Sequence, residues 1–202
     1  MAAPVPELRI VAGEWRGRRI AVPDGTVRPT ADKVREAWMS IVRPALDLAH
    51  VVDLCAGTGA LGLEALSRGA SHCDFVDESA AVLTTLRKNI AALGAGDRAT
   101  VHRAEAVGFI ESQLPVAGHG PSVDASADVG VAKRPWDVAF ADPPYGQGIA
   151  LALAERWLRA PFATIFGVEH EAGLTLPPGP GGAATDRRAY GITAITFYRT
   201  GR

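Results

Sequence analysis

The sequence predicts an α/β fold, in which a mostly parallel sheet carries helices on both faces and ends in an antiparallel hairpin. Three observations support this prediction. From residue 50 onward, short apolar runs alternate with helical patterns at the spacing of strand–helix–strand units. A glycine-rich loop follows the first apolar run and opens a helix. Near the end of the chain, residues 184–190 and 192–199 flank the lone Gly191 and are predicted to form a hairpin.

The first 44 residues are predicted to form a small extension of one hairpin and one helix. Residues 8–12 and 18–22 are the strands of the hairpin, with a glycine-containing turn between them. After a loop at 23–29, Thr30 can cap a helix that ends before Pro44. Apolar residues recur in this helix at helical spacing, and they are Val34, Trp38, Ile41 and Val42.

The remaining residues, 45–202, are predicted to form the main domain. Strands are expected at residues 51–54, 73–76, 99–103, 138–141 and 164–168, and helices from the glycine loop to about 67, at 79–93, 107–114 and 150–158. Segments 115–135 and 176–182 fall outside this alternation and are predicted loops.

Composition and charge restrict the class of protein. The chain has 202 residues, 48% of them hydrophobic, and a net charge of -1, which is typical of a folded soluble protein. No apolar run is long enough to span a bilayer, the start lacks the features of a signal peptide, and two cysteines form no disulfide framework. These features favour the cytoplasm. Residues 1–43 carry eight Lys or Arg against five acids, which is compatible with a nucleic-acid contact or with an ordinary solvated surface.

The loop Gly57-Thr58-Gly59-Ala60-Leu61-Gly62 matches the pattern G-x-G-x-x-G between a predicted strand and a helix. Asp77, at the end of the next strand, can bind the hydroxyls of a ribose, so a nicotinamide or flavin dinucleotide is one candidate ligand. Asp53 lies where a pyrophosphate would need positive potential, and it therefore favours the cationic S-adenosylmethionine. Glu105, with Ala106 beside it, is placed to reach the adenine edge. A tight turn without a ligand remains open, as does a purely structural Asp53 that binds loop amides.

The tetrapeptide Asp142-Pro143-Pro144-Tyr145 follows the fourth predicted strand, at the sheet edge where open α/β sheets bind ligands. The prolines remove two backbone donors and leave carbonyls that only accept hydrogen bonds. The Asp142 side chain and the Pro143 carbonyl can hold the N–H groups of an exocyclic base amine, while Tyr145 stacks on the base. The alternative is a turn without a catalytic role.

Four segments together resemble the RsmD family of 16S ribosomal RNA guanine-N2 methyltransferases, within the class I S-adenosylmethionine-dependent methyltransferases. The segments are Arg9-Ile10-Val11-Ala12-Gly13-Glu14-Trp15-Arg16-Gly17-Arg18, Arg28-Pro29-Thr30-Ala31-Asp32-Lys33-Val34-Arg35-Glu36, residues 53–69 beginning Asp53-Leu54-Cys55-Ala56-Gly57, and Asp142-Pro143-Pro144-Tyr145. The resemblance implies a Rossmann-like, seven-stranded methyltransferase domain at 45–202, preceded by a basic, RNA-contacting extension at 1–44. It also implies methylation of the guanine called position 966, within the small ribosomal subunit or its assembly intermediate.

The resemblance also implies roles for individual residues. Catalysis is expected from Asp142, Pro143, Pro144 and Tyr145. The cofactor is expected to contact Asp53, Ala56, Gly57, Thr58, Gly59, Asp77, Glu78, Glu105 and Ala106. RNA or the target base is expected to contact Arg9, Arg16, Arg18, Arg28, Thr30 and Arg35. The chain departs from the family pattern in carrying Glu105 at the adenine position and in the length of segment 115–135.

The predicted reaction is an in-line displacement, in which the amine attacks the sulfonium methyl group and S-adenosylhomocysteine leaves. Alternatives are an adenine-N6 methyltransferase acting on DNA or RNA, a nicotinamide oxidoreductase, and a non-catalytic RNA-binding assembly factor. The five histidines show no metal-ligand spacing, so no metal is expected. The cysteines and Trp38 are predicted to be core residues, Trp15 is open to packing or base stacking, and the chain is expected to be a monomer.

Overall fold

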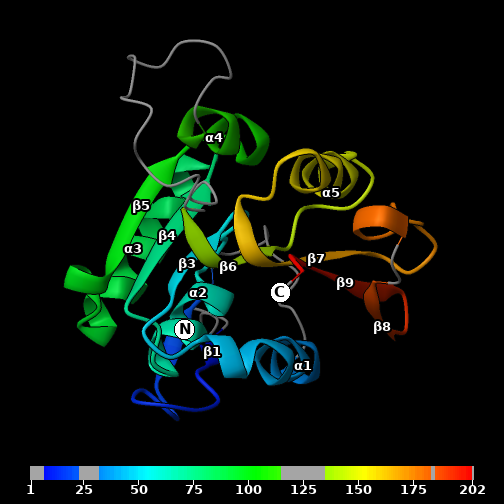
Figure 1. Cartoon of the computed structure of the whole chain (residues 1–202). Helices are drawn as coiled ribbons and strands as arrows, with labels where there is room; N and C mark the ends of the chain where they lie inside the picture. The colour runs from blue at the N-terminus through cyan, green and yellow to red at the C-terminus, as the bar shows by residue number, and fades with distance from the viewer. Residues whose placement is uncertain (1–6, 23–31, 115–134, 183–184, 202) are drawn as a thin grey trace, which may run out of the picture.

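A central sheet organises the computed structural model, which describes residues 7–22, 32–114, 135–182 and 185–201 (Figure 1). Within these residues, seven strands pair in the order β5-β4-β3-β6-β7-β9-β8. The strands are β3 (His50–Asp53), β4 (His72–Asp77), β5 (Ala99–Arg103), β6 (Trp136–Ala141), β7 (Ala163–Glu171), β8 (Asp186–Tyr190) and β9 (Thr193–Arg199). The first five are parallel, whereas β9 pairs antiparallel with both β7 and β8. The predicted parallel sheet with a C-terminal antiparallel hairpin is confirmed.

Helices cover both faces of this sheet, as predicted. They are α1 (Asp32–Val42), α2 (Ala60–Ser67), α3 (Ala80–Leu93), α4 (Ala106–Gln113) and α5 (Ile149–Arg159), with short 3-10 turns at Arg43–Ala45, Gly96–Arg98 and Pro180–Gly182. One hydrophobic cluster lies between the sheet and α1, α2 and α3, and a second lies between the sheet and α4 and α5. Figure 1 shows α4 and α5 above the sheet and α1 and α2 below it. The helix ends follow local capping: Ser79 caps α3, and Gly94 ends it with a left-handed φ of 70°.

The N-terminal hairpin packs on α2. Its strands, β1 (Glu7–Arg9) and β2 (Arg19–Ala21), are shorter than predicted because the pairing ends after Ile10, whose amide donates to the Arg18 carbonyl at 2.9 Å. The amides of Val11 and Ala12 instead donate to the buried Glu64 carboxylate, at 2.8 and 3.0 Å. Ile10, Trp15 and Ile20 belong to the same apolar cluster as the sheet. The extension therefore shares its core with the main domain. The proposed division at residue 44 stays a prediction, and the predicted Thr30 cap lies outside the described residues.

The two tryptophans of the N-terminal third are packing residues. Trp38 is fully buried and meets Phe140 and Phe197 edge-on, at centroid distances of 5.5 and 5.1 Å, which confirms its predicted core role. Trp15 is 4% exposed, and the Arg98 guanidinium lies 4.8 Å from its ring centre. Packing is therefore the role that this structure gives Trp15. No helix among the described residues is long and apolar enough to cross a membrane.

Candidate active site

Three parallel strands bring three aspartates to one edge of the sheet. Asp53 ends β3, Asp77 ends β4, and Asp142 directly follows β6. Because β3 lies between β4 and β6, the carboxyl ends of these strands are neighbours. The helix after β3 packs on one face and the helix after β6 on the other, so this edge contains the point where ligands bind in open α/β sheets.

The glycine loop is held by two of these aspartates. Asp77 accepts a hydrogen bond from the Gly57 amide at 3.0 Å, and Asp53 accepts one from the Gly62 amide, also at 3.0 Å. Gly59 has a φ of 84°, and a Cβ there would lie 2.5 Å from a Leu86 methyl carbon. The loop therefore needs glycine at this position. One oxygen of Asp53 thus binds a loop amide, which is the structural role that the sequence analysis left open. The contact of Asp53 with a cofactor stays a prediction.

The carboxyl edge carries a strong negative field. Burial raises the pKa of Asp53 to about 7, the Gly62 amide opposes this rise, and the charges of Asp142 and Asp77 add to it. Burial also raises the pKa of the nearby Cys55 thiol, and the charges of Asp53, Asp142, Asp77 and Glu105 raise it further. The negative charges of four carboxylates thus act on this thiol, with Asp53 contributing fully only above about pH 7. Such a field repels a pyrophosphate and attracts a cationic ligand.

Glu105 and its neighbours have local structural roles at the start of α4. The Glu105 carboxylate caps this helix, accepting hydrogen bonds from the amides of Val107 at 2.9 Å and Gly108 at 2.7 Å. Its exposed side chain and the buried Ala106 follow β5, next to the end of β4. The exposed Glu78 accepts from Arg103 through its backbone carbonyl. The adenine contact of Glu105 and the cofactor contact of Glu78 stay predictions.

The tetrapeptide after β6 is anchored at its tyrosine. Pro143 is buried, Pro144 is exposed, and Asp142 and Tyr145 are half-buried. The Tyr145 hydroxyl donates to Glu169 Oε1 at 3.2 Å and lies 2.6 Å from Thr193 Oγ1. Sequence reasoning missed both partners. A signal existed for Glu169, an acid directly after the mostly apolar predicted strand 164–168, but nothing local singles out Thr193.

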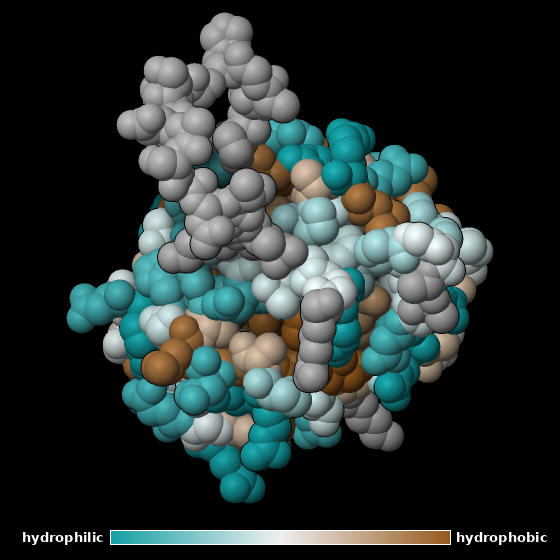
Figure 2. Space-filling view, viewed as in Figure 1, coloured by the Kyte–Doolittle hydropathy of each residue, from teal (hydrophilic) through white to brown (hydrophobic). Residues whose placement is uncertain are grey.

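The residues predicted to contact RNA separate into three groups. Arg9, Arg16 and Arg18 are exposed on the hairpin, although the Arg18 guanidinium also donates to the Ala92 carbonyl. Figure 2 shows hydrophilic side chains along the lower edge of the molecule, where Figure 1 places this hairpin. Arg28 and Thr30 lie outside the described residues.

Arg35 is buried, unlike the arginines of the hairpin. Its side chain is 1% exposed, and its guanidinium donates to the Arg9 carbonyl at 3.0 Å. It lies one turn before the fully buried Trp38, on the face of α1 that packs against the sheet. Helical spacing thus turns this side chain inward, and the expected contact of Arg35 with RNA or the target base stays a prediction.

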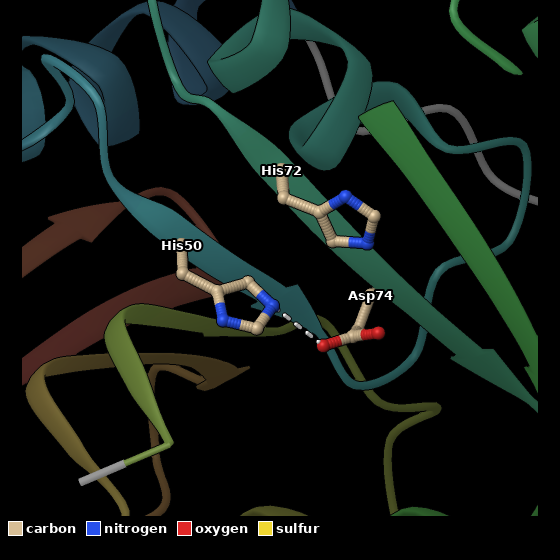
Figure 3. Close-up of side chains that lie close together, drawn as sticks. All are labelled: His50, His72 and Asp74. Carbon is tan, nitrogen blue, oxygen red and sulfur yellow. Dashed lines mark hydrogen bonds and ion pairs between the residues drawn. The ribbon is translucent and has the colours of Figure 1, made fainter. Parts of the chain in front are cut away.

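A second polar cluster lies at the opposite, amino-terminal edge of the sheet. Figure 3 shows His50, His72 and Asp74, whose potential ligand atoms all lie within 4.8 Å of one another. Asp74 accepts from Trp136 Nε1 at 2.8 Å, and its two oxygens lie 2.9 Å from ring nitrogens of His50 and His102. Burial opposes the ionisation of Asp74, but these partners outweigh it and lower its pKa. Sequence spacing could not reveal this cluster, because strand pairing alone assembles it. The expectation that the protein holds no metal stays a prediction.

Comparison with known proteins gives consistent matches over nearly the whole chain. The family model described as conserved hypothetical protein 95 matches residues 8–199. The ribosomal RNA small subunit methyltransferase D of Escherichia coli (strain K12) is 36% identical over 200 residues, which cover 96% of this chain and 90% of that protein. The protein of the same name from Haemophilus influenzae is 30% identical over 96% of this chain and 94% of its own length. A solved structure of a hypothetical protein from Thermus thermophilus superposes with a TM-score of 0.74 at 26% identity, covering 96% of this chain and 99% of that one.

Proposed function

This chain belongs to the RsmD family, whose model is described as conserved hypothetical protein 95, and on that premise we propose that it methylates the exocyclic N2 amine of a guanine in 16S ribosomal RNA. The methyl donor is S-adenosylmethionine. The single observation that carries the proposal is the carboxyl edge of the sheet, where a carboxylate-lined glycine loop lies beside an acceptor-rich tetrapeptide. The family relationship supports the same reaction, because the E. coli and H. influenzae relatives are named as ribosomal RNA small subunit methyltransferases.

The residues at the glycine loop fit S-adenosylmethionine better than a dinucleotide. The cofactor carries a sulfonium and an ammonium group, and it supplies a methyl group on a good leaving group. Asp53, Asp77 and Asp142 provide the negative field that these cations need. Ala56, Gly57, Thr58 and Gly59 form the backbone of the binding loop, with Glu78, Glu105 and Ala106 along its adenosine side.

The tetrapeptide positions the target amine. The lone pair of a guanine N2 amine is delocalised into the ring, so the amine must be turned and held before it can attack. In this proposal the Asp142 carboxylate and the Pro143 carbonyl accept its two N–H groups, and the Tyr145 ring supports the base. Pro144 keeps the backbone rigid and removes a competing donor.

The RNA partner, the oligomeric state and the cellular location are part of the same proposal. The substrate is 16S RNA within the small subunit or an assembly intermediate, with guanine 966 as the expected target. Arg9, Arg16 and Arg18 on the hairpin contact its phosphates, and Arg28 and Thr30 contact the RNA or the target base. The protein acts as a cytoplasmic monomer.

The direct test incubates the purified protein and radiolabelled S-adenosylmethionine with small subunits from a strain that lacks the enzyme. Label is expected in 16S RNA as N2-methylguanosine, and mass mapping identifies the nucleotide. Label in N6-methyladenosine would instead indicate the adenine-directed alternative. Binding to the subunit without any transferred label would indicate a non-catalytic assembly factor.

Asp53→Asn is expected to increase stability at neutral pH in the absence of cofactor. Because the folded pKa lies near 7 and the ordinary value is 3.8, the folded state holds a proton that the unfolded state has lost between these pH values. The wild-type protein therefore loses stability as pH rises from about 4 to 7, by on the order of 2–4 kcal/mol. The asparagine variant lacks this slope and should melt several degrees higher at pH 7.5.

Thermal melts of both proteins from pH 5 to 8 check this expectation. The gap between the two melting temperatures should narrow toward pH 5. Calorimetry at pH 8, where Asp53 is ionised, should show that the variant binds S-adenosylmethionine at least about tenfold more weakly, since one negative charge is lost. Identical melting curves across the whole range would contradict the assignment of a buried, costly charge to Asp53.

Arg9→Ala combined with Arg16→Ala is expected to weaken 16S RNA binding and to reduce its salt dependence. Each phosphate contact contributes about 0.7–0.9 to the slope of log affinity against log salt concentration, so the slope should fall by roughly 1.5. The matched control is the exposed Arg159→Ala at the end of α5, on the other face of the sheet. Equal slopes for wild type and double variant would exclude this hairpin as a phosphate contact.

A further inference from the structure

Glu169 is a buried carboxylate beside the tetrapeptide, and none of the recognised sequence segments includes it. It lies near the carboxyl end of β7, which pairs in parallel with β6, and its side chain is among the buried polar groups at 5% exposure. Ala141, the last residue of β6, is opposite Val168 in this pairing. Glu169 thus lies in β7 at the level where Asp142 follows β6.

Both oxygens of Glu169 have hydrogen-bond donors. Oε1 accepts from the Tyr145 hydroxyl at 3.2 Å, and Oε2 accepts from Trp38 Nε1 at 3.5 Å. Thr193 Oγ1, on β9, lies 2.6 Å from the same tyrosine hydroxyl. The tyrosine hydroxyl is therefore anchored by two neighbouring strands of the sheet.

A glycine-rich turn follows Tyr145 and leads to α5. Gly146 and Gly148 belong to this turn, both with left-handed φ values of 77° and 74°, and a Cβ at either position would meet no atom within 4 Å. These two glycines carry no side chain that could hold the ring, whereas the hydroxyl at its far end is held by Glu169 and Thr193.

The buried Glu169 carboxylate lowers the stability of the folded protein, and the fold does not require an acid at this position. Burial raises its pKa, and the negative charge of Asp142 raises it further, against the hydrogen bonds from Trp38 and Tyr145. A buried carboxylate facing another acid is less favourable than an apolar side chain of similar volume. Residues that lower stability in this way are typical of functional sites.

We infer that Glu169 is a positioning residue of methyl transfer, which acts through the Tyr145 hydroxyl to fix the ring that supports the target base. This inference rests on the proposed function. Glu169 touches neither the base nor the methyl group in this assignment. Its role is to hold the tyrosine plane at one orientation relative to Asp142, so that the bound amine stays aligned.

A double-mutant cycle tests the inference. Glu169→Leu removes both acceptors at similar volume, and Tyr145→Phe removes only the hydroxyl. Each is expected to lower kcat on small subunits by about 10- to 100-fold, because misalignment at the reacting centre is expensive. The Kd for S-adenosylmethionine should stay within twofold. The combined variant should be no slower than the slower single variant, because both changes break the same anchor.

Two further variants separate positioning from general structure. Glu169→Gln keeps an oxygen acceptor for the tyrosine hydroxyl and should restore kcat to within about threefold of wild type. The exposed Glu171→Leu removes a carboxylate two residues further along the same strand and should leave kcat unchanged. If Glu169→Leu does not fold, Tyr145→Phe tests the anchor by itself, and a wild-type kcat in that variant would overturn the positioning role.

The outcomes distinguish this inference from the proposed function. Wild-type protein that transfers no methyl group to 16S RNA overturns the proposed function. Thermal unfolding of the four proteins of the cycle then tests the anchor directly, and non-additive melting temperatures are expected. The positioning role is wrong if the wild type is active and the kcat losses of the two single variants multiply in the combined variant. It is also wrong if Glu169→Leu keeps the wild-type kcat. In both cases the proposed function stands.

Discussion

Asp142→Ala is expected to abolish measurable methyl transfer, a loss in kcat of at least about 100- to 1000-fold, while S-adenosylmethionine still binds. The carboxylate is the strongest acceptor at the tip of β6, and without it the guanine amine keeps its resonance-flattened orientation. Cofactor binding survives because Asp53 and Asp77 remain. Loss of the Asp142 charge also removes one of the effects that raise the pKa of Asp53, so Asp53 ionises more readily.

Asp142→Asn is the matched control for this prediction. It keeps a carbonyl oxygen that can accept one N–H group, so a residual rate above that of the alanine variant is expected. Initial rates on small subunits and calorimetric titration with S-adenosylmethionine measure the two effects separately. Near-normal turnover in the alanine variant would remove Asp142 from the mechanism.

Gly13→Ala is expected to detach the N-terminal hairpin from α2 and to lower stability by about 3–5 kcal/mol. A Cβ at Gly13 would lie 1.7 Å from the Ser67 carbonyl oxygen, and Gly13 has a φ of 84°. The backbone must therefore move, which breaks the 2.7 Å hydrogen bond from the Glu14 amide to that carbonyl. The bond from the Trp15 amide to Ser67 Oγ, at 3.0 Å, depends on the same approach.

Gly17→Ala separates the two causes of this loss. Gly17 has nearly the same φ, 85°, but a Cβ there would meet nothing within 4 Å. Only the left-handed backbone strain remains, so the expected cost is about 1–2 kcal/mol. Chemical denaturation measures both variants, and RNA binding should fall with Gly13→Ala because the hairpin carries Arg9 and Arg16. Equal losses of stability would show that the close approach to Ser67 contributes nothing.

The alternation of elements and the candidate active site could be predicted because their signals are local. Apolar spacing marks each strand and helix, since a half-buried element must place its apolar side chains on one face. Gly57 and Gly59 directly follow the first strand, and Asp142 directly follows the fourth. In a parallel sheet these positions share the carboxyl edge, so sequence order alone predicts that they are neighbours.

Other features depend on contacts between residues that are distant in sequence. Glu169 meets Tyr145 only because β7 pairs with β6, and Thr193 joins them through the pairing of β9. Arg35 belongs to a basic segment, yet the packing of α1 turns it inward.

The sequence by itself determined the α/β architecture and the places of the glycine loop and the Asp142–Tyr145 tetrapeptide at the carboxyl edge of the sheet, because each depends on the order and spacing of neighbouring residues. Only the tertiary structure decided which charged side chains are buried and which remain at the surface. Two examples are the buried Glu64, which accepts hydrogen bonds from amides of the hairpin, and the pair of His50 and Asp74. The physical reason is that the burial and partners of a side chain are set by strand pairing and helix packing across the whole chain, which no local pattern encodes.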